Sequence, residues 1–379
     1  MIKRISLVIS ILFFSFCSEA QFSVRIQITG YFNISDYRAD VLFVAGSFNS
    51  WNPGDSNYRM LTKPNGIQYS DLILYSGTYE YKITRGAWDK VECKADGTKI
   101  QNRVIKIERD TTISITIEGW KDNFKIKPRT STASRNVHII DTAFLIPQLN
   151  RKRKVWVYLP PTYDSSQKKY SVLYMQDGQN VFDDSTSFAG EWGVDETLDS
   201  ISRHSKEIIV VAVDHGGSKR INEYCPYNME KYGKGEGGPY LDFLVKTLKP
   251  FIDKHYRTKR DKQNTFIAGS SMGGLISMYA VLKYPKTFGG AGIFSPAFWI
   301  GPKIFDDINK KGEGVNSKIY FYCGGQESET MQPEMERAFE EMRKVSRSNM
   351  VCIIRPNGKH TEWVWKEEFP LFYLWLMMK

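Results

Sequence analysis

Cysteine and histidine are scarce in this chain, with five of each among 379 residues. Their positions form no spacing typical of a zinc site, and no segment carries a pattern typical of nucleic-acid binding. We therefore expect no metal, no cofactor and no nucleic-acid partner. Because histidine is the commonest general base in proteins, its scarcity also narrows the search for a proton acceptor.

Long hydrophobic runs are also missing. An apolar region near the start, Ile5–Phe16, is shorter than the roughly 20 residues that span a bilayer, and no other segment resembles a membrane span. Lys3 and Arg4 precede this region, and the small-residue site Ser18–Ala20 follows it. This order predicts a signal peptide over residues 1–20, export to a periplasm or the cell exterior, and no stable membrane insertion.

Four cysteines remain beyond the predicted signal peptide: Cys93, Cys225, Cys323 and Cys352. An oxidising compartment permits disulfides, and the three pairings of four cysteines stay open. The net charge is +10, with basic stretches such as Arg257–Lys262. This excess fits anionic substrates or acidic polymers, although a solvated surface is the default interpretation. Nothing in the sequence determines the oligomeric state.

The segment Gly269–Gly273 reads Gly-Ser-Ser-Met-Gly and lies between the apolar runs Thr265–Ala268 and Leu275–Leu282. A strand, a sharp turn with a serine at its apex, and a helix form the G-x-S-x-G nucleophile elbow of α/β-hydrolases. The glycines suit a strained turn whose backbone crowds both neighbouring elements. We therefore predict that Ser271 is a nucleophile.

A nucleophilic serine needs a base, and α/β-hydrolases place their triad in the chain order serine, acid, histidine. Only His360 lies beyond Ser271, in a turn-like stretch after the apolar run Met350–Ile354. The acid should follow the preceding strand, where Glu327 comes first after a Gly-Gly turn and Glu329 is the alternative. The predicted triad is Ser271, His360 and Glu327.

An oxyanion hole needs two backbone donors, one after the nucleophile and one after the third strand. The first is the amide of Met272. The second is expected after the strand Ser171–Gln176, where Gly178 permits a turn that presents the amide of Gln179. Asp177 is expected to brace this loop.

From about Val137 to Lys379 the chain resembles the esterase family that includes feruloyl and acetyl xylan esterases, siderophore trilactone esterases, S-formylglutathione hydrolases and mycolyltransferases. The matching stretches, besides the elbow, are Val155–Pro161, Val172–Asp184, Arg220–Tyr224 and Gly358–His360. The resemblance implies an α/β-hydrolase fold without a metal and ester cleavage through an acyl-enzyme. It also implies the roles given above for Ser271, His360, Met272 and Gln179, and Glu327 fits members that use glutamate as the acid. Arg220 and Glu223 are expected to pair and fix their loop.

Residues 21–122 contain short alternating runs punctuated by Gly, Asn, Asp and Pro, which predicts an all-β, immunoglobulin-like sandwich. This part resembles starch- and glycogen-binding modules in Gly46–Pro53, Tyr79–Lys82, Trp88, Asn102, Arg103 and Trp120. The resemblance implies that Trp88 stacks on a sugar ring while Lys82 and Asn102 bond its hydroxyl groups. A purely structural domain is an equal alternative. Residues 123–136 are polar and basic, and are expected to form a linker.

Residues 137–379 alternate strand and helix patterns, which predicts an α/β domain with a mostly parallel, eight-stranded sheet covered on both faces. Strands are expected near Val137–Phe144, Lys154–Leu159, Ser171–Gln176, Ile208–Val213, Thr265–Ser270, Gly290–Phe294, Lys318–Cys323 and Met350–Ile354. Helices are expected near Tyr240–Tyr256, with a kink at Pro250, and near Met272–Tyr284, Pro333–Val345 and Glu367–Met378.

These features predict an exported serine esterase that cleaves acyl esters on a polysaccharide or oligosaccharide, of the feruloyl or acetyl type. A siderophore trilactone esterase is the alternative within enzymes. A polysaccharide-binding protein with an inactive hydrolase domain is the alternative from another class, and the intact Ser271, His360 and Glu327 argue against it. The sequence identifies neither the acyl group nor the leaving alcohol.

Overall fold

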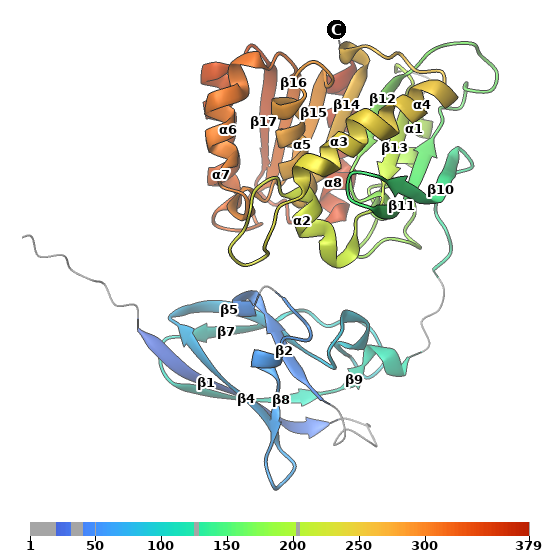
Figure 1. Ribbon diagram of the computed structural model, residues 1–379. Helices are drawn as coiled ribbons and strands as arrows, with labels where there is room; N and C mark the ends of the chain where they lie inside the picture. Colours follow the sequence, from blue (N-terminus) through green and yellow to red (C-terminus); the bar gives the residue numbers. More distant parts are fainter. Residues whose placement is uncertain (1–19, 32–40, 50, 125–128, 202–204, 379) are drawn as a thin grey trace, which may run out of the picture. The chain divides into compact units, whose positions relative to one another are not determined.

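The computed structural model describes residues 20–31, 41–49, 51–124, 129–201 and 205–378. Nearly all of the predicted signal peptide lies outside these residues. The chain divides into two compact units, Met1–Lys127 and Pro128–Lys379 (Figure 1). Within the described ranges, no helix has both the length and the apolar character needed to cross a bilayer.

The first unit is built from β-strands that form two main sheets and a small one (Figure 1). The main sheets have the orders β3-β4-β1-β8 and β2-β5-β7, and β6 pairs with β9. The strands are β1 (Gln21–Tyr31), β2 (Phe43–Gly46), β3 (Leu61–Thr62), β4 (Gln68–Tyr75), β5 (Gly77–Thr84), β6 (Glu92–Cys93), β7 (Arg103–Ile107), β8 (Thr111–Ile117) and β9 (Gly119–Trp120).

Both main sheets of this unit contribute to one hydrophobic core. Ile26 of β1 and Ile115 of β8 come from one sheet, and Ile83 of β5 and Ile107 of β7 come from the other. Alternate residues of β4 are buried, as expected for a strand with one face toward a core and one toward water. The strands agree with the predicted sandwich, while its immunoglobulin-like topology stays a prediction.

The second unit contains the eight-stranded sheet that the sequence predicts. Its order is β10-β11-β13-β12-β14-β15-β16-β17, in which β11 pairs antiparallel with both β10 and β13 and the remaining neighbours run parallel. The strands are β10 (Val137–Ile146), β11 (Arg151–Tyr158), β12 (Ser171–Met175), β13 (Ile208–Val213), β14 (Thr265–Ser270), β15 (Gly290–Phe294), β16 (Lys318–Gly324) and β17 (Asn349–Arg355).

Helices cover both faces of this sheet (Figure 1). Along β12, Val172 and Tyr174 join one core cluster, while Leu173 and Met175 join another. The first cluster contains residues of α3 to α7, and the second contains residues of α1 and α8. The helices are α1 (Val194–Ile201), α2 (Arg220–Tyr224), α3 (Gly237–Phe243), α4 (Lys249–His255), α5 (Met272–Lys283), α6 (Ile304–Lys311), α7 (Met331–Val345) and α8 (Glu362–Met377).

Two of the predicted helices differ from the observed ones. The helix expected over Tyr240–Tyr256 is divided into α3, a π-helical segment at Leu244–Leu248, and α4. Pro250 therefore lies in the first turn of α4, where a missing N–H is tolerated, and does not kink a continuous α-helix. Helix α8 begins already at Glu362, close behind His360.

The segment expected as a linker, residues 123–136, is in part attached to the second unit. Ser131 Oγ donates to Asp183 Oδ2 at 2.8 Å, and the Ser134 amide donates to Asp195 Oδ2 at 2.7 Å. Asn136 Nδ2 donates to the carboxylate of Asp199 at 2.7 Å. Hydroxyl and amide groups of this polar segment thus donate hydrogen bonds to carboxylates of the α/β unit. The division between the units falls after Lys127.

Candidate active site

Ser271 lies at the sharp turn between β14 and α5, with backbone angles of φ 58° and ψ −120°. Residues other than glycine rarely adopt these backbone angles, so the turn is strained. The turn also leaves no room for larger residues, because a Cβ atom on Gly269 would lie 2.9 Å from the carbonyl carbon of Gly273. The Ser271 amide donates to the Phe294 carbonyl at 2.9 Å, and the Ala297 amide donates to the Ser271 carbonyl at 3.0 Å. Both bonds hold the turn in place.

His360 and Glu327 are brought together at the C-terminal edge of the sheet. His360 Nδ1 lies 2.7 Å from Glu327 Oε2. The side chain of Glu327 is 1% exposed and that of His360 is 36% exposed. Of the two candidate acids, Glu327 therefore contacts the imidazole, whereas Glu329 is exposed. A buried carboxylate on Nδ1 leaves Nε2 to accept a proton.

The carboxylate of Glu327 is held by further donors. Its Oε1 accepts hydrogen bonds from Ser295 Oγ and from the Gly324 amide, each at 2.6 Å. Ser295 is fully buried with φ 42°, and its hydroxyl accepts from Trp365 Nε1 at 2.9 Å. The Trp365 ring also meets the His360 ring edge to face, with centroids 5.0 Å apart. Glu327 and His360 are therefore fixed by a connected set of contacts.

Sequence reasoning did not identify Ser295 or Trp365. Ser295 directly follows β15, at the same sheet edge as the other site residues. This position indicates that Ser295 lies near the site, but the sequence does not show which side chain its hydroxyl contacts. Trp365 lies on α8, which the sequence placed further along the chain, so its side chain was not expected near His360.

Ser271 and His360 both follow C-terminal ends of strands in one sheet, β14 and β17. Within the ranges that the structure describes, neither the Ser271 hydroxyl nor His360 Nε2 forms a hydrogen bond. Both groups are therefore available to each other or to a substrate. Catalytic hydrogen bonds in unliganded sites are often loose and tighten when substrate binds.

The predicted oxyanion donors lie on two rigid segments. Met272 is the first residue of α5, so its amide points outward at the positive end of the helix dipole. Gln179 lies in a 3₁₀ turn, Gly178–Asn180, whose glycine packs against β13: a Cβ there would lie 2.8 Å from the Val213 carbonyl carbon. Gln179 Oε1 accepts from the His215 amide at 3.1 Å, which fixes its side chain.

Asp177 braces this turn through Arg220. Its two oxygens accept from Arg220 Nε at 2.6 Å and from Nη2 at 2.7 Å. The expected pair between Arg220 and Glu223 is therefore wrong. Glu223 is fully buried and binds Arg151, at 2.7 Å, and Arg153. A bidentate arginine–carboxylate pair is stronger and more directional than a pair across one turn of a short helix.

Glu362 is a second carboxyl group close to the site. Its Oε1 accepts from Asn180 Nδ2 at 3.2 Å, which joins the first turn of α8 to the 3₁₀ turn Gly178–Asn180. Burial raises the pKa of Glu362, the negative charge of Asp177 raises it further, and the charges of His360 and Arg220 oppose this shift. Sequence reasoning missed this residue because its helix was expected to begin later.

In the first unit, the three predicted sugar-binding residues have different surroundings. Trp88 is half-buried, and its ring lies 6.2 Å from that of Trp51. Lys82 is only 6% exposed, and its ammonium donates to the carbonyl of Ile100 at 2.7 Å. Its charge is used within the protein, which differs from the expected role on sugar hydroxyl groups. Asn102 Nδ2 donates to Glu80 Oε2 at 2.9 Å.

Several known proteins resemble this chain. Curated relatives include the uncharacterized protein YbbA of Bacillus subtilis, 26% identical over 208 residues that cover 52% of this chain and 77% of YbbA. An endo-1,4-beta-xylanase/feruloyl esterase of Xylanibacter ruminicola is 29% identical over 177 residues, which cover 45% of this chain and 22% of that enzyme. The solved structure of the enterobactin esterase from Shigella flexneri with enterobactin has a TM-score of 0.52 at 14% identity and covers 89% of both chains. At that identity the likeness shows a shared fold.

A model of the family described as "Putative esterase" matches residues 146–370. The matched segment spans more than half of the chain and contains the elbow serine together with Glu327 and His360. The chain therefore belongs to this esterase family and is an ester hydrolase.

Proposed function

We propose that this esterase is exported and cleaves acyl esters on carbohydrates with Ser271 as nucleophile, His360 as base and Glu327 as the acid that orients it. One observation carries the proposal: His360 Nδ1 contacts the buried carboxylate of Glu327 at 2.7 Å. A carboxylate so placed fixes the imidazole tautomer with Nε2 unprotonated and stabilises the imidazolium that forms during catalysis. The strained serine turn supplies the nucleophile.

The proposed reaction follows from these positions. His360 Nε2 takes the proton of Ser271 while Oγ attacks the ester carbonyl carbon. The carbonyl oxygen becomes an oxyanion and accepts hydrogen bonds from the amides of Met272 and Gln179, each of which stabilises it by roughly 3–4 kcal/mol. Collapse of this intermediate expels the alcohol, which takes the proton from His360. Water then repeats the sequence on the acyl-enzyme and releases the acid.

Two observations support a carbohydrate substrate. The relative from Xylanibacter ruminicola is named as both a xylanase and a feruloyl esterase. The first unit holds the half-buried Trp88, the residue predicted to stack on a sugar ring, with its ring centroid 6.2 Å from that of Trp51. Aromatic faces of this kind stack on sugar rings. Export rests on the predicted signal peptide at residues 1–20.

A siderophore trilactone esterase is the second candidate. The fold of the enterobactin esterase from Shigella flexneri covers 89% of this chain, a share that the second unit alone does not reach. The likeness therefore extends into the first unit. A basic protein with net charge +10 also suits an anionic siderophore.

A substrate panel separates the two candidates. Purified wild type is assayed on feruloylated xylan, acetylated xylan, starch-derived esters and an enterobactin-type trilactone, with Ser271→Ala as the inactive control. The proposal predicts the highest kcat/KM on one of the carbohydrate esters. Preference for the trilactone would establish the second candidate. Equal activity of wild type and Ser271→Ala on every ester would contradict the proposed nucleophile.

A further inference from the structure

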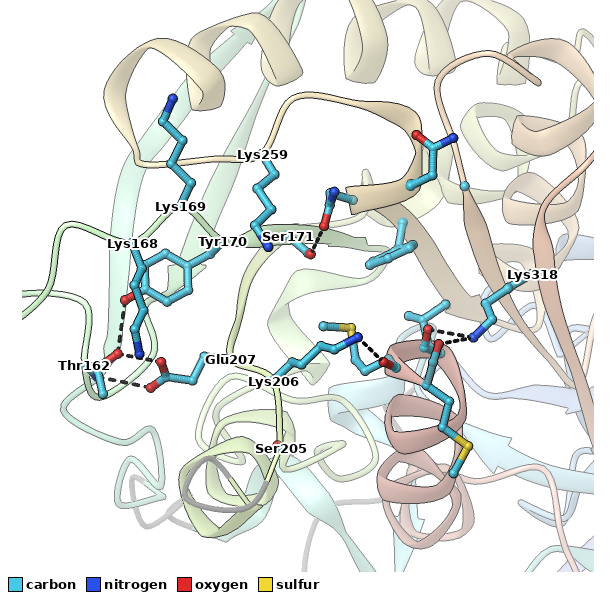
Figure 2. Close-up of a pocket in the computed structure, with 17 residues that line it drawn as sticks. Thr162, Lys168, Lys169, Tyr170, Ser171, Ser205, Lys206, Glu207, Lys259 and Lys318 are labelled. Carbon is cyan, nitrogen blue, oxygen red and sulfur yellow. Dashed lines mark hydrogen bonds between the residues drawn. The ribbon is translucent and has the colours of Figure 1, made fainter.

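A cavity of about 980 Å³ lies in the second unit, where the strands of its sheet begin (Figure 2). It is lined at the beginnings of parallel strands: Ser171 starts β12, Phe266 is the second residue of β14, and Lys318 starts β16. Ser271 follows the other end of β14, which places it roughly 16 Å along the strand at about 3.3 Å per residue. The cavity is therefore separate from the candidate active site, and its volume is in the range of small-molecule sites.

The lining of this cavity carries a strong excess of positive charge. It contains one acidic residue, Glu207, whose carboxylate accepts hydrogen bonds from the amide and hydroxyl of Thr162. Against this single acid stand five lysines: Lys168, Lys169, Lys206, Lys259 and Lys318.

Two of the five lysines have fixed positions. Lys206 Nζ donates to the Met377 carbonyl at 2.7 Å, and Lys318 Nζ donates to the Met378 carbonyl at 2.6 Å. Figure 2 shows these side chains reaching the end of α8 from opposite sides. Burial lowers the pKa of Lys318, and the charge of Lys206 lowers it further.

The other three lysines are exposed, and their ammonium groups have no ion pair or hydrogen bond with any residue that the structure describes. They lie on two basic segments, residues 168–169 and 257–262, that main-chain hydrogen bonds hold side by side. The Tyr170 amide donates to the Arg257 carbonyl at 2.9 Å, and the Lys259 amide donates to the Tyr170 carbonyl at 2.8 Å. The basic stretch found in the sequence thus forms part of the cavity wall.

We propose that this cavity is a binding site for a polyvalent oxyanion, a ligand that carries two or more phosphate or carboxylate groups. Lys168 and Lys259 supply unpaired charge from one side, and Lys206 and Lys318 supply fixed charge from the other. Gln263 also lines the cavity and adds a neutral amide. Lysines that converge on a concave surface attract anions because a low-dielectric wall focuses their field.

Phosphate groups occur on compact ligands and carboxylate groups occur along acidic polysaccharides. These two classes of ligand differ in shape, so the test uses one probe for each. Inorganic pyrophosphate represents a compact phosphate ligand, and tetragalacturonate represents an acidic polysaccharide. Each is titrated calorimetrically into the full chain at low ionic strength, with neutral xylotetraose as the uncharged control. We expect saturable binding of at least one anion, and no binding of xylotetraose. The probe that binds more tightly shows whether the site takes a compact phosphate ligand or an acidic polysaccharide.

Matched variants locate the site. The double variant K168A/K259A should bind the anion at least ten-fold more weakly than wild type. The control variant K303A/K344A removes two exposed lysines that do not line the cavity. Lys303 directly precedes α6 and Lys344 lies in α7, so this variant should bind the anion as wild type does. Both variants should retain hydrolysis of p-nitrophenyl acetate, which shows that they fold. The proposal is overturned if neither anion saturates, or if both double variants weaken binding equally.

Discussion

The indole nitrogen of Trp365 donates to Ser295 Oγ at 2.9 Å and so ties helix α8 to the strand edge that holds the carboxylate of Glu327. Ser295 Oγ in turn donates to Glu327 Oε1 at 2.6 Å. The position of Glu327, whose carboxylate contacts His360, therefore depends through Ser295 on Trp365 of α8. Such connected, buried hydrogen bonds stabilise one geometry when every member is satisfied.

Removing the Ser295 hydroxyl should reduce activity more than stability. Ser295→Ala removes one of two donors to Glu327 Oε1, and a hydrogen bond to a charged group contributes about 1.5–3 kcal/mol. We expect kcat/KM for p-nitrophenyl acetate to fall by roughly 10- to 100-fold. The matched control is Ser277→Ala, because Ser277 is equally buried and its hydroxyl has no partner within the described residues. Equal loss in both variants would contradict a positioning role for Ser295.

Breaking the pair between Asp177 and Arg220 should destabilise the second unit. Their side chains are 8% and 23% exposed, so Asp177→Ala leaves a largely buried guanidinium without its carboxylate. Loss of one partner of such a pair costs roughly 3–5 kcal/mol, measurable by urea unfolding. Glu340→Ala removes the partner of Arg343 on the surface of α7 and should cost less than about 1 kcal/mol. A small loss for Asp177→Ala would show that the pair does not brace the turn Gly178–Asn180.

The sequence predicts the sheet well because buried parallel strands appear as continuous apolar runs. The six strands β12 to β17 lie where those runs are. The antiparallel strands β10 and β11 also lie where strands are predicted, although their sequences are more polar. The contact between His360 and Glu327 fits the family's chain order. Helices α1, α2 and α6 were not expected, because each has eight residues or fewer and a helical period repeats too few times over that length to stand out. The last helix is predicted only from Glu367, whereas the structure begins it at Glu362.

The residues that hold the site were harder to predict. Ser295 and Glu362 acquire their roles only through partners distant in the chain, Trp365 and Asn180. The expected pair of Arg220 with Glu223 failed because proximity along a helix does not reveal which carboxylate a side chain reaches in space. Lys82 matched a sugar-binding pattern, yet its ammonium is bound to backbone carbonyls.

The pH dependence of stability should change in Glu362→Gln. Burial raises the pKa of Glu362, so the folded chain holds this proton more tightly than the unfolded chain. Wild type therefore loses stability as pH rises from the ordinary glutamate pKa through the raised folded value. Glutamine keeps an acceptor for Asn180 without a charge. We expect a higher Tm for the variant at pH 8, and a smaller difference at pH 4.

The exposed Glu329 offers a control for this pH effect, because its carboxylate has no described hydrogen-bond partner. Glu329→Gln should leave the curve of Tm against pH unchanged. A Tm difference between Glu362→Gln and wild type that stays constant from pH 4 to pH 8 would argue against a raised pKa of Glu362.

The described cysteines should behave as unreactive thiols. All four are free, and burial raises the pKa of Cys323 to about 12 and that of Cys352 to about 11. Little thiolate then exists at pH 8 to attack a disulfide reagent. Ellman's reagent should react slowly with the native chain and rapidly after unfolding, and dithiothreitol should not change Tm. A fall in Tm with dithiothreitol would reveal a disulfide.

Covalent labelling by a fluorophosphonate tests most directly whether Ser271 is a nucleophile activated by His360. Such reagents phosphonylate an activated serine hydroxyl, and mass spectrometry of the digested protein locates the adduct. We expect a single adduct on the peptide that contains Ser271 in the wild type, none in Ser271→Ala, and labelling at least 100-fold slower in His360→Gln. An adduct on another serine, or an unchanged labelling rate in His360→Gln, would contradict this expectation.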